Sequence, residues 1–151
     1  MTSNTINIAF ANINGFGNKV DQIRDYMMKE KIDIICLVET WLQYKDNVAL
    51  RPVVLDVRRI AEQHQGSCRG TEGILIITVP ELRNKIKIKK VDVNKRWVEL
   101  QINDIVIICA YHPPSMDMND VKMFWKEMNK KARDIVTINN NNNNNLSLIH
   151  I

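Results

Sequence analysis

The sequence is poor in glycine, proline, cysteine and aromatic residues: it holds five glycines, four prolines and three cysteines, and 6% of its 151 residues are aromatic. So little glycine and proline excludes a collagen-like chain and a Pro/Gly-rich disordered chain. The apolar fraction of 45% is high enough to bury a hydrophobic core. The length suits one domain and is too short for two well-buried ones.

Cysteine usage and the absence of targeting signals indicate the cellular compartment of the protein. The three cysteines are an odd number without histidine partners at zinc spacing, and Cys36 and Cys109 lie inside apolar runs, which is typical of buried thiols. The N-terminus has no signal peptide, and no apolar run is long enough to cross a bilayer. We therefore expect a soluble, intracellular protein without a membrane partner. The sequence favours neither nucleus nor cytoplasm.

The hydrophobic pattern predicts an α/β protein. Alternation over 6–11, helical spacing over 20–30 and a continuous apolar run over 34–38 predict a strand–helix–strand unit with two parallel strands. Further strands are expected at 53–57, 73–79, 85–91, 97–102 and 105–111, with a tight hairpin at Asn103-Asp104. A second helix is expected over 117–134 and another strand over 135–138. This order indicates a layered domain with a mixed sheet or two packed sheets.

Two polar residues follow the first two predicted strands. Asn12 comes after the first strand and Glu39 after the second, so a parallel pairing would bring both to one edge of the sheet, where open α/β sheets bind ligands. One carboxylate beside a carboxamide is a reasonable oxygen site for Mg²⁺. The alternative is that Glu39 only caps the strand end or forms a salt bridge there.

The positive charge is concentrated in residues 83–96, which hold seven basic residues against one acidic residue, in a chain of net charge +4. A basic strip of this kind attracts phosphate backbones and gives salt-sensitive binding. The alternative is structural: Ile86 and Ile88 would face a core, while the lysines would form the solvated face of an edge strand.

Four segments in order resemble the endonuclease/exonuclease/phosphatase superfamily, whose fold is deoxyribonuclease I-like. They are Asn12-Ile13-Asn14-Gly15, Glu39-Thr40-Trp41, Glu72-Gly73-Ile74-Leu75-Ile76 and Ala110-Tyr111-His112-Pro113-Pro114. The sequence is most similar to the endonuclease domains of non-LTR retrotransposons. The resemblance implies a four-layer α/β sandwich and Mg²⁺- or Mn²⁺-dependent hydrolysis of a DNA phosphodiester.

The resemblance also implies roles for individual residues. Glu39 would be the main metal ligand, Asn12 would contribute to the metal site or hold the scissile phosphate, and Tyr111 would point its hydroxyl at that phosphate. The alternative for Tyr111 is an aromatic residue packed at a strand end. The residues expected to contact phosphate or nucleic acid are Asn14, Lys85, Lys87, Lys89, Lys90 and Arg96. Pro114 stands where many nuclease relatives have asparagine.

The resemblance ends at the C-terminus. The family pattern continues with Gly-Asp-x-Asn and later Ser-Asp-His, which activate the attacking water, whereas this sequence has an asparagine run at 139–145. We therefore expect residues 1–138 to be the N-terminal part of such a domain, inactive by itself. The resemblance to retrotransposon endonucleases also allows a downstream reverse transcriptase in a full-length parent protein, which the sequence itself does not reveal. Residues 139–151 would be a low-complexity tail, disordered or artefactual. Two alternatives are a non-catalytic nucleic-acid-binding remnant and a phosphomonoesterase of the same superfamily.

Overall fold

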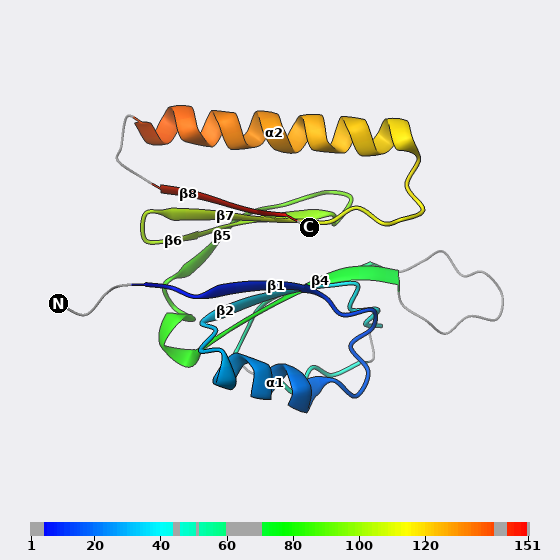
Figure 1. Cartoon of the computed structure of the whole chain (residues 1–151), viewed down its shortest axis with the longest axis vertical. Coiled ribbons are helices and arrows are strands. Elements are labelled where there is room, and N and C mark those ends of the chain that lie inside the picture. Colours follow the sequence, from blue (N-terminus) through cyan, green and yellow to red (C-terminus); the bar gives the residue numbers. More distant parts are fainter. Residues whose placement is uncertain (1–4, 44–45, 51, 60–70, 141–144, 151) are drawn as a thin grey trace. The chain divides into compact units, whose positions relative to one another are not determined.

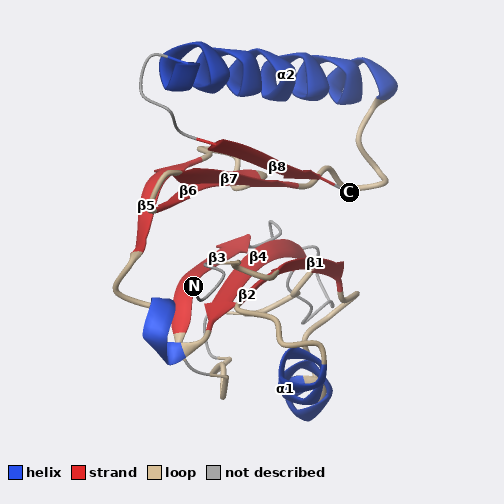
Figure 2. Cartoon of the chain, turned by 60° about the vertical axis from the view of Figure 1, so that its left-hand side comes forward, coloured by secondary structure: helices blue, strands red, loops and turns tan. Residues whose placement is uncertain are grey.

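The computed structural model describes residues 5–43, 46–50, 52–59, 71–140 and 145–150. The chain divides into two compact units, which we call unit 1 (residues 1–84) and unit 2 (residues 85–151). Each unit contains one four-stranded sheet and one long helix (Figures 1 and 2). The α/β class predicted from the sequence is confirmed. None of the described helices has the length and apolar character needed to cross a membrane.

The sheet of unit 1 has the strand order β1-β2-β4-β3. Its strands are β1 (Ile8–Asn12), β2 (Ile34–Val38), β3 (Val53–Arg59) and β4 (Thr71–Thr78). β1 and β2 are parallel, as predicted, and β4 is antiparallel to both β2 and β3. All five residues of β2 are buried, which explains why its sequence is a continuous apolar run rather than an alternating one.

Helix α1 (Val20–Lys29) covers one face of this sheet (Figure 2). Its buried residue Ile23 joins a core cluster with Phe16, Leu37 and Leu75, among others. The helix begins after Lys19, and no side-chain hydrogen bond caps it there. The short 3₁₀ helix η1 (Pro80–Leu82) follows β4.

The sheet of unit 2 has the strand order β5-β6-β7-β8. Its strands are β5 (Ile86–Val91), β6 (Trp97–Ile102), β7 (Ile105–Ala110) and β8 (Asn145–His150). β5, β6 and β7 form an antiparallel meander, and Ile102 pairs with Ile105, which confirms the predicted hairpin at Asn103-Asp104. β8 pairs with β7 in parallel.

Helix α2 (Met118–Asn140) packs on one face of this sheet (Figures 1 and 2). Phe124 and Met128 are buried against Trp97 and Ile108 of the sheet, and Ile135 packs against the same cluster. The strand predicted over 135–138 is therefore wrong: these residues continue α2. The physical reason is helical spacing, because Ile135 lies seven residues after Met128 and extends the same apolar stripe.

The low-complexity tail predicted over 139–151 needs a partial correction. Asn139 and Asn140 belong to α2, and the backbone of 145–150 forms β8; the remaining residues of the predicted tail lie outside the described part of the chain. A strand is favoured here because Leu146-Ser147-Leu148 alternates in polarity, and because the edge of β7 offers unpaired hydrogen-bonding groups.

Candidate functional site

Three chain segments meet at one edge of the unit 1 sheet. Asn12, the last residue of β1, is the register partner of Val38, the last residue of β2, and Glu39 follows directly. β4 runs in the opposite direction and begins at this edge, where Ile74 pairs with Val38. The parallel register therefore brings Asn12 and Glu39 to neighbouring strand ends, as the sequence predicted.

Backbone hydrogen bonds join the three segments. The amide of Gly15 donates to the carbonyl oxygen of Glu39 at 2.7 Å, and that of Phe16 donates to Thr40 at 2.8 Å. On the other side, the amide of Trp41 donates to the carbonyl oxygen of Glu72 at 2.9 Å. The residues after β2 are thus held on one side by the loop before α1 and on the other by the start of β4.

Several residues of this edge have left-handed backbone conformations. φ is +48° at Asn14, +54° at Glu39, +53° at Trp41 and +54° at Glu72. Such conformations are uncommon for residues other than glycine and cost about 1–3 kcal/mol each. They persist only where the surrounding structure holds them, which is a pattern found at functional sites.

The side chains at this edge differ in exposure. Asn12 and Asn14 are exposed, whereas Glu39 is half-buried. The Oδ1 atom of Asn12 accepts a hydrogen bond from the backbone amide of Asn14 at 3.1 Å, so Asn12 shapes the turn that follows it. Lys19, which the sequence analysis did not single out, donates from Nζ to the carbonyl oxygens of Ile13 and Asn14.

These residues fit a divalent metal ion by the chemistry of their donors. A half-buried carboxylate at Glu39 and an exposed carboxamide at Asn12 are oxygen ligands, which Mg²⁺ prefers, and Mg²⁺ commonly takes one or two carboxylates and keeps several waters. Among the described residues, no group of three or more His, Cys, Asp or Glu side chains could hold a metal.

Tyr111 belongs to unit 2 and follows directly after β7. Its side chain is buried, at 7% exposure, and its backbone amide donates to the carbonyl oxygen of Arg96 at 2.9 Å. The structure thus groups the predicted site residues in two sets. Asn12, Asn14 and Glu39 lie together in unit 1, and Tyr111 and Arg96 are joined through their backbones in unit 2.

The basic strip spans β5, the edge strand of its sheet, and the residues on either side of it; Lys85, just before β5, and Lys87, Lys89 and Lys90, within β5, are all exposed. Ile86 is buried, but Ile88 is 43% exposed, so the predicted core-facing role holds for only one of the two isoleucines. The register of β5 against β6 shifts between Ile88 and Lys90, which interrupts the alternation of faces.

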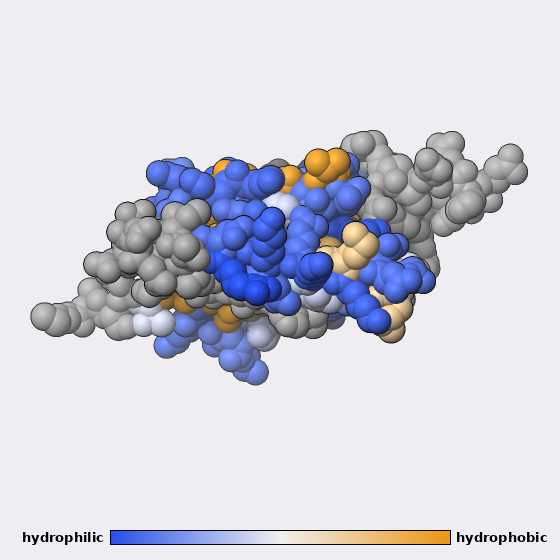
Figure 3. Space-filling model, turned by 90° about the horizontal axis from the view of Figure 1, so that it is seen from above, coloured by the Kyte–Doolittle hydropathy of each residue, from blue (hydrophilic) through white to orange (hydrophobic). Residues whose placement is uncertain are grey.

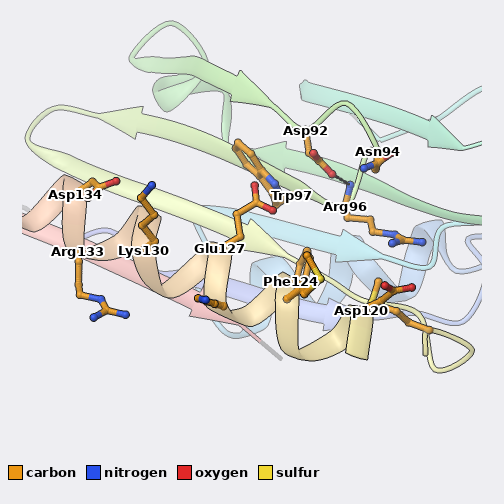
Figure 4. A pocket seen from close by; sticks show the side chains of 13 residues that line it. Asp92, Asn94, Arg96, Trp97, Asp120, Phe124, Glu127, Lys130, Arg133 and Asp134 are labelled. Carbon is orange, nitrogen blue, oxygen red and sulfur yellow. Dashed lines mark hydrogen bonds between the residues drawn. The ribbon is translucent and has the colours of Figure 1, made fainter. Parts of the chain in front are cut away.

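A pocket of about 890 Å³ lies in unit 2 between α2 and the turn from β5 to β6 (Figure 4). Trp97 and Phe124 line it together with four basic and four acidic side chains; these are Arg96, Lys126, Lys130, Arg133, Asp92, Asp120, Glu127 and Asp134. The balance of charge does not favour a polyanion in this pocket. Sequence reasoning missed it, although several α2 residues in its lining recur at helical spacing.

The surface seen from the α2 side is mainly hydrophilic, with a few hydrophobic residues among the polar ones (Figure 3). The exposed hydrophobic residues of α2 include Met118 and Met123, at 66% and 70% exposure. Scattered exposed side chains of this kind are ordinary on protein surfaces and do not by themselves mark a binding site.

Comparison with solved structures identifies the fold. The chain superposes on the 3′ phosphatase NExo from Neisseria, bound to a product DNA hairpin, with a TM-score of 0.61 and 16% sequence identity over 97% of this chain and 57% of that one. It superposes on the 3′-5′ exonuclease NExo from Neisseria meningitidis with a TM-score of 0.60 and 15% identity over 95% of this chain and 56% of that one. The fold is deoxyribonuclease I-like.

This fold is the one that the sequence resemblance implied. The chain spans a little more than half the length of these two solved structures. No protein-family model and no curated protein matches the sequence.

Proposed function

We propose that the chain is part of a Mg²⁺- or Mn²⁺-dependent phosphodiesterase that acts on DNA, of the retrotransposon endonuclease type. The observation that carries this proposal is the unit 1 sheet edge, where Glu39 has a left-handed backbone and follows the register partner of Asn12, within a deoxyribonuclease I-like fold. The two NExo structures support a DNA substrate, because one is described as a 3′ phosphatase bound to DNA and the other as an exonuclease.

In this proposal Glu39 holds the metal ion, and the Asn12 carboxamide either contributes an oxygen ligand or orients the phosphate. Asn14 supports the same loop, since its amide is bonded to the Asn12 side chain. When bound, the metal neutralises the charge that develops on the phosphate oxygens. Tyr111 lies in unit 2 and is 7% exposed, so its part in the proposal rests on the sequence resemblance alone, by which its hydroxyl would act as a fixed donor to the phosphate.

The 151 residues contain neither a Gly-Asp-x-Asn nor a Ser-Asp-His segment. General base catalysis needs a group within hydrogen-bond reach of the attacking water. We therefore expect the 151-residue chain by itself to bind metal and phosphate without hydrolysing the bond. In a longer protein, a reverse transcriptase domain would follow the nuclease domain.

Metal binding tests the site directly. Titration with Mn²⁺, followed by electron paramagnetic resonance, should show that Glu39→Gln weakens binding at least about tenfold, because the only carboxylate proposed as a ligand is lost. Glu30→Gln, at the exposed end of α1, makes the same chemical change in the same unit and should bind like the unsubstituted chain. Equal Mn²⁺ binding by Glu39→Gln would contradict the proposed site.

Hydrolysis is tested on three substrates with Mg²⁺: supercoiled plasmid, a DNA hairpin carrying a 3′ phosphate, and an inositol phosphate. We expect no turnover by the 151-residue chain. Plasmid nicking that Glu39→Gln abolishes would support the nuclease and overturn its inactivity. Phosphate release without nicking would favour the phosphomonoesterase alternative, to which the 3′ phosphatase description of one NExo structure lends support.

A second candidate function is DNA binding without catalysis, through the β5 lysines. It is favoured by the exposure of Lys87, Lys89 and Lys90 on an edge strand and of Lys85 just before that strand. Lys87→Glu with Lys89→Glu should weaken DNA binding and reduce its salt dependence by about one ion per lost phosphate contact. Lys29→Glu with Lys122→Glu makes the same charge change at exposed helix positions and should leave the salt slope almost unchanged. An unaltered slope in the β5 variant would exclude this function.

A further inference from the structure

The side chains of Thr40 and Trp41 each lie against a glycine. Glu39 is followed by Thr40 and Trp41, and the glycines are Gly15, in the loop before α1, and Gly73, at the start of β4. We propose that Trp41 and Thr40 are positioning residues, which hold the left-handed backbone of Glu39 by filling the space over Gly15 and Gly73. This inference rests on the proposed metal site.

Trp41 packs directly on the backbone of Gly15. A Cβ atom placed on Gly15 would lie 2.7 Å from Cε3 and 3.1 Å from Cζ3 of the Trp41 ring, so the contact exists only because this residue has no side chain. Gly15 also has φ of +91°, which side-chain-bearing residues rarely adopt. The amide of Gly15 also donates a hydrogen bond to the Glu39 carbonyl oxygen. The packing of the Trp41 ring and this hydrogen bond therefore both restrain the chain from Glu39 to Trp41.

Thr40 makes the corresponding contact on the other side. A Cβ atom on Gly73 would lie 2.4 Å from the Thr40 Oγ1 atom, and Thr40 is 1% exposed. Within the described part of the chain, its hydroxyl has no hydrogen-bond partner. A buried hydroxyl without a partner is destabilising, so the useful property of Thr40 at this position is its branched shape rather than its hydrogen-bonding capacity.

These two contacts bear on the metal ligand because they fix the two residues that directly follow Glu39 in the chain. A site of this kind requires ligand atoms placed to within about 0.5 Å, and the residues that lock the ligands are as important as the ligands themselves. The left-handed conformation of Glu39 is unfavourable for an isolated residue. Loss of the Trp41 or Thr40 packing would let this backbone relax and would move the carboxylate away from the side of Asn12.

The test measures Mn²⁺ affinity of the full chain, with folding checked by circular dichroism and thermal melting. Trp41→Ala and Gly15→Ala should each weaken Mn²⁺ binding about tenfold, as substitutions of supporting residues commonly do. Gly17→Ala is the matched control: Gly17 also has a positive φ, +37°, but no atom of the described residues lies within 4 Å of the point that a Cβ atom would occupy there. Its Mn²⁺ affinity should change less than about twofold.

Three further variants separate positioning from general loss of stability. Gly15→Ala combined with Trp41→Ala should bind Mn²⁺ only slightly more weakly than Trp41→Ala alone, because the ring that the new methyl group meets is gone and only the strain of the positive φ remains. Trp41→Phe should recover part of the affinity. Thr40→Val, which keeps the shape and removes the unpaired hydroxyl, should keep the affinity and melt at an equal or higher temperature.

The outcomes distinguish this inference from the proposed function. If Trp41→Ala remains folded and binds Mn²⁺ like the unsubstituted chain, while Glu39→Gln loses binding, the positioning role is overturned and the metal site stands. If Glu39→Gln binds Mn²⁺ normally, the proposed metal site fails and this inference fails with it. If Gly17→Ala weakens binding as much as Gly15→Ala, the effect comes from backbone strain alone and the role of the Trp41 ring is overturned.

Discussion

Left-handed residues are distributed differently in the two units. In the described part of unit 2 they are Lys95 and Asn103, which lie in the turns that join β5 to β6 and β6 to β7. Tight hairpin turns require such conformations, so the topology accounts for both. In unit 1, Lys31 is likewise explained, because it follows the end of α1, where helices commonly terminate with a left-handed residue.

The remaining left-handed residues of unit 1 lie outside hairpins and helix ends, and Glu72 among them lies in β4, where the register against β3 is irregular, as at a β-bulge. Asn14, Glu39, Trp41 and Glu72 lie in three segments at one sheet edge, and two of them carry carboxylates. Neither a hairpin nor a helix end requires this arrangement. In unit 1, strained left-handed backbone conformations therefore lie where a ligand site is expected. In the described part of unit 2 they lie only in the turns between strands.

The largest expected effects on stability follow from substitutions in the hydrophobic core of each unit. Leu75 in the unit 1 sheet and Met128 in α2 are both fully buried. Replacement of either by alanine should lower the free energy of unfolding by about 2–5 kcal/mol, measured by urea unfolding. Leu75→Ala should lower the free energy of unfolding more than Met128→Ala, because a strand paired on both sides cannot move into the cavity as readily as a helix can. A loss below about 1 kcal/mol would show that the side chain is not part of an ordered core.

Arg58 provides a second test of how firmly the unit 1 sheet edge is held. It lies near the end of β3, and its side chain bonds to the segment that follows the candidate site. Its guanidinium forms two hydrogen bonds with Asp56 Oδ2, at 2.9 and 2.8 Å, and it also donates to the carbonyl oxygens of Gln43 and Asp46. Both charged side chains are mostly buried, at 14% and 22% exposure.

Arg58→Met should therefore destabilise the chain by about 2–3 kcal/mol, since it leaves the half-buried Asp56 carboxylate without its cation and removes one donor each from the carbonyl oxygens of Gln43 and Asp46. Arg58→Lys should recover little, because an ammonium group cannot reproduce the forked geometry. Thermal melting measures both. If Arg58→Lys is as stable as the unsubstituted chain, the geometry of the guanidinium does not matter at this position.

Sequence patterns predicted most of the fold and the sheet edge at which Asn12 and Glu39 lie, for identifiable reasons, whereas the role of this edge as a site stays a prediction. The five apolar residues of β2 and the alternation of β1 depend on local burial, and the parallel pairing that follows from them is enough to bring Asn12 and Glu39 to one edge. The hairpin at Asn103-Asp104 is encoded by two adjacent residues, so it too was predictable.

The features that were missed depend on contacts between distant segments. Ile135 continues α2 because Trp97 and Ile108 supply its packing surface, and a short β-branched run alone predicted a strand. The exposure of Ile88 follows a register shift that no local pattern marks. The close approach of Trp41 to Gly15 joins two loops, and only the folded sheet edge brings them together.

The smallest expected effects concern two ion pairs, one in each unit. In unit 2, Lys131 lies 2.9 Å from the Glu99 carboxylate and 4.3 Å from the centre of the Trp97 ring, and its side chain is 19% exposed. In unit 1, the Arg24–Asp21 pair has the same 2.9 Å separation, but its side chains are 50% and 85% exposed. Distance alone would rank the two pairs as equal.

Burial predicts that they are not equal. Lys131→Met should lower the free energy of unfolding by about 1–2 kcal/mol, because it removes a shielded ion pair and a cation–π contact together. Arg24→Met should change it by less than about 0.5 kcal/mol, and about 0.5 M NaCl should abolish that small difference. Urea unfolding at low and high salt measures both. If the two variants lost equal stability, burial would not be what makes the unit 2 contact stronger, and α2 would have to be held on its sheet by the apolar stripe of Phe124, Met128 and Ile135 alone.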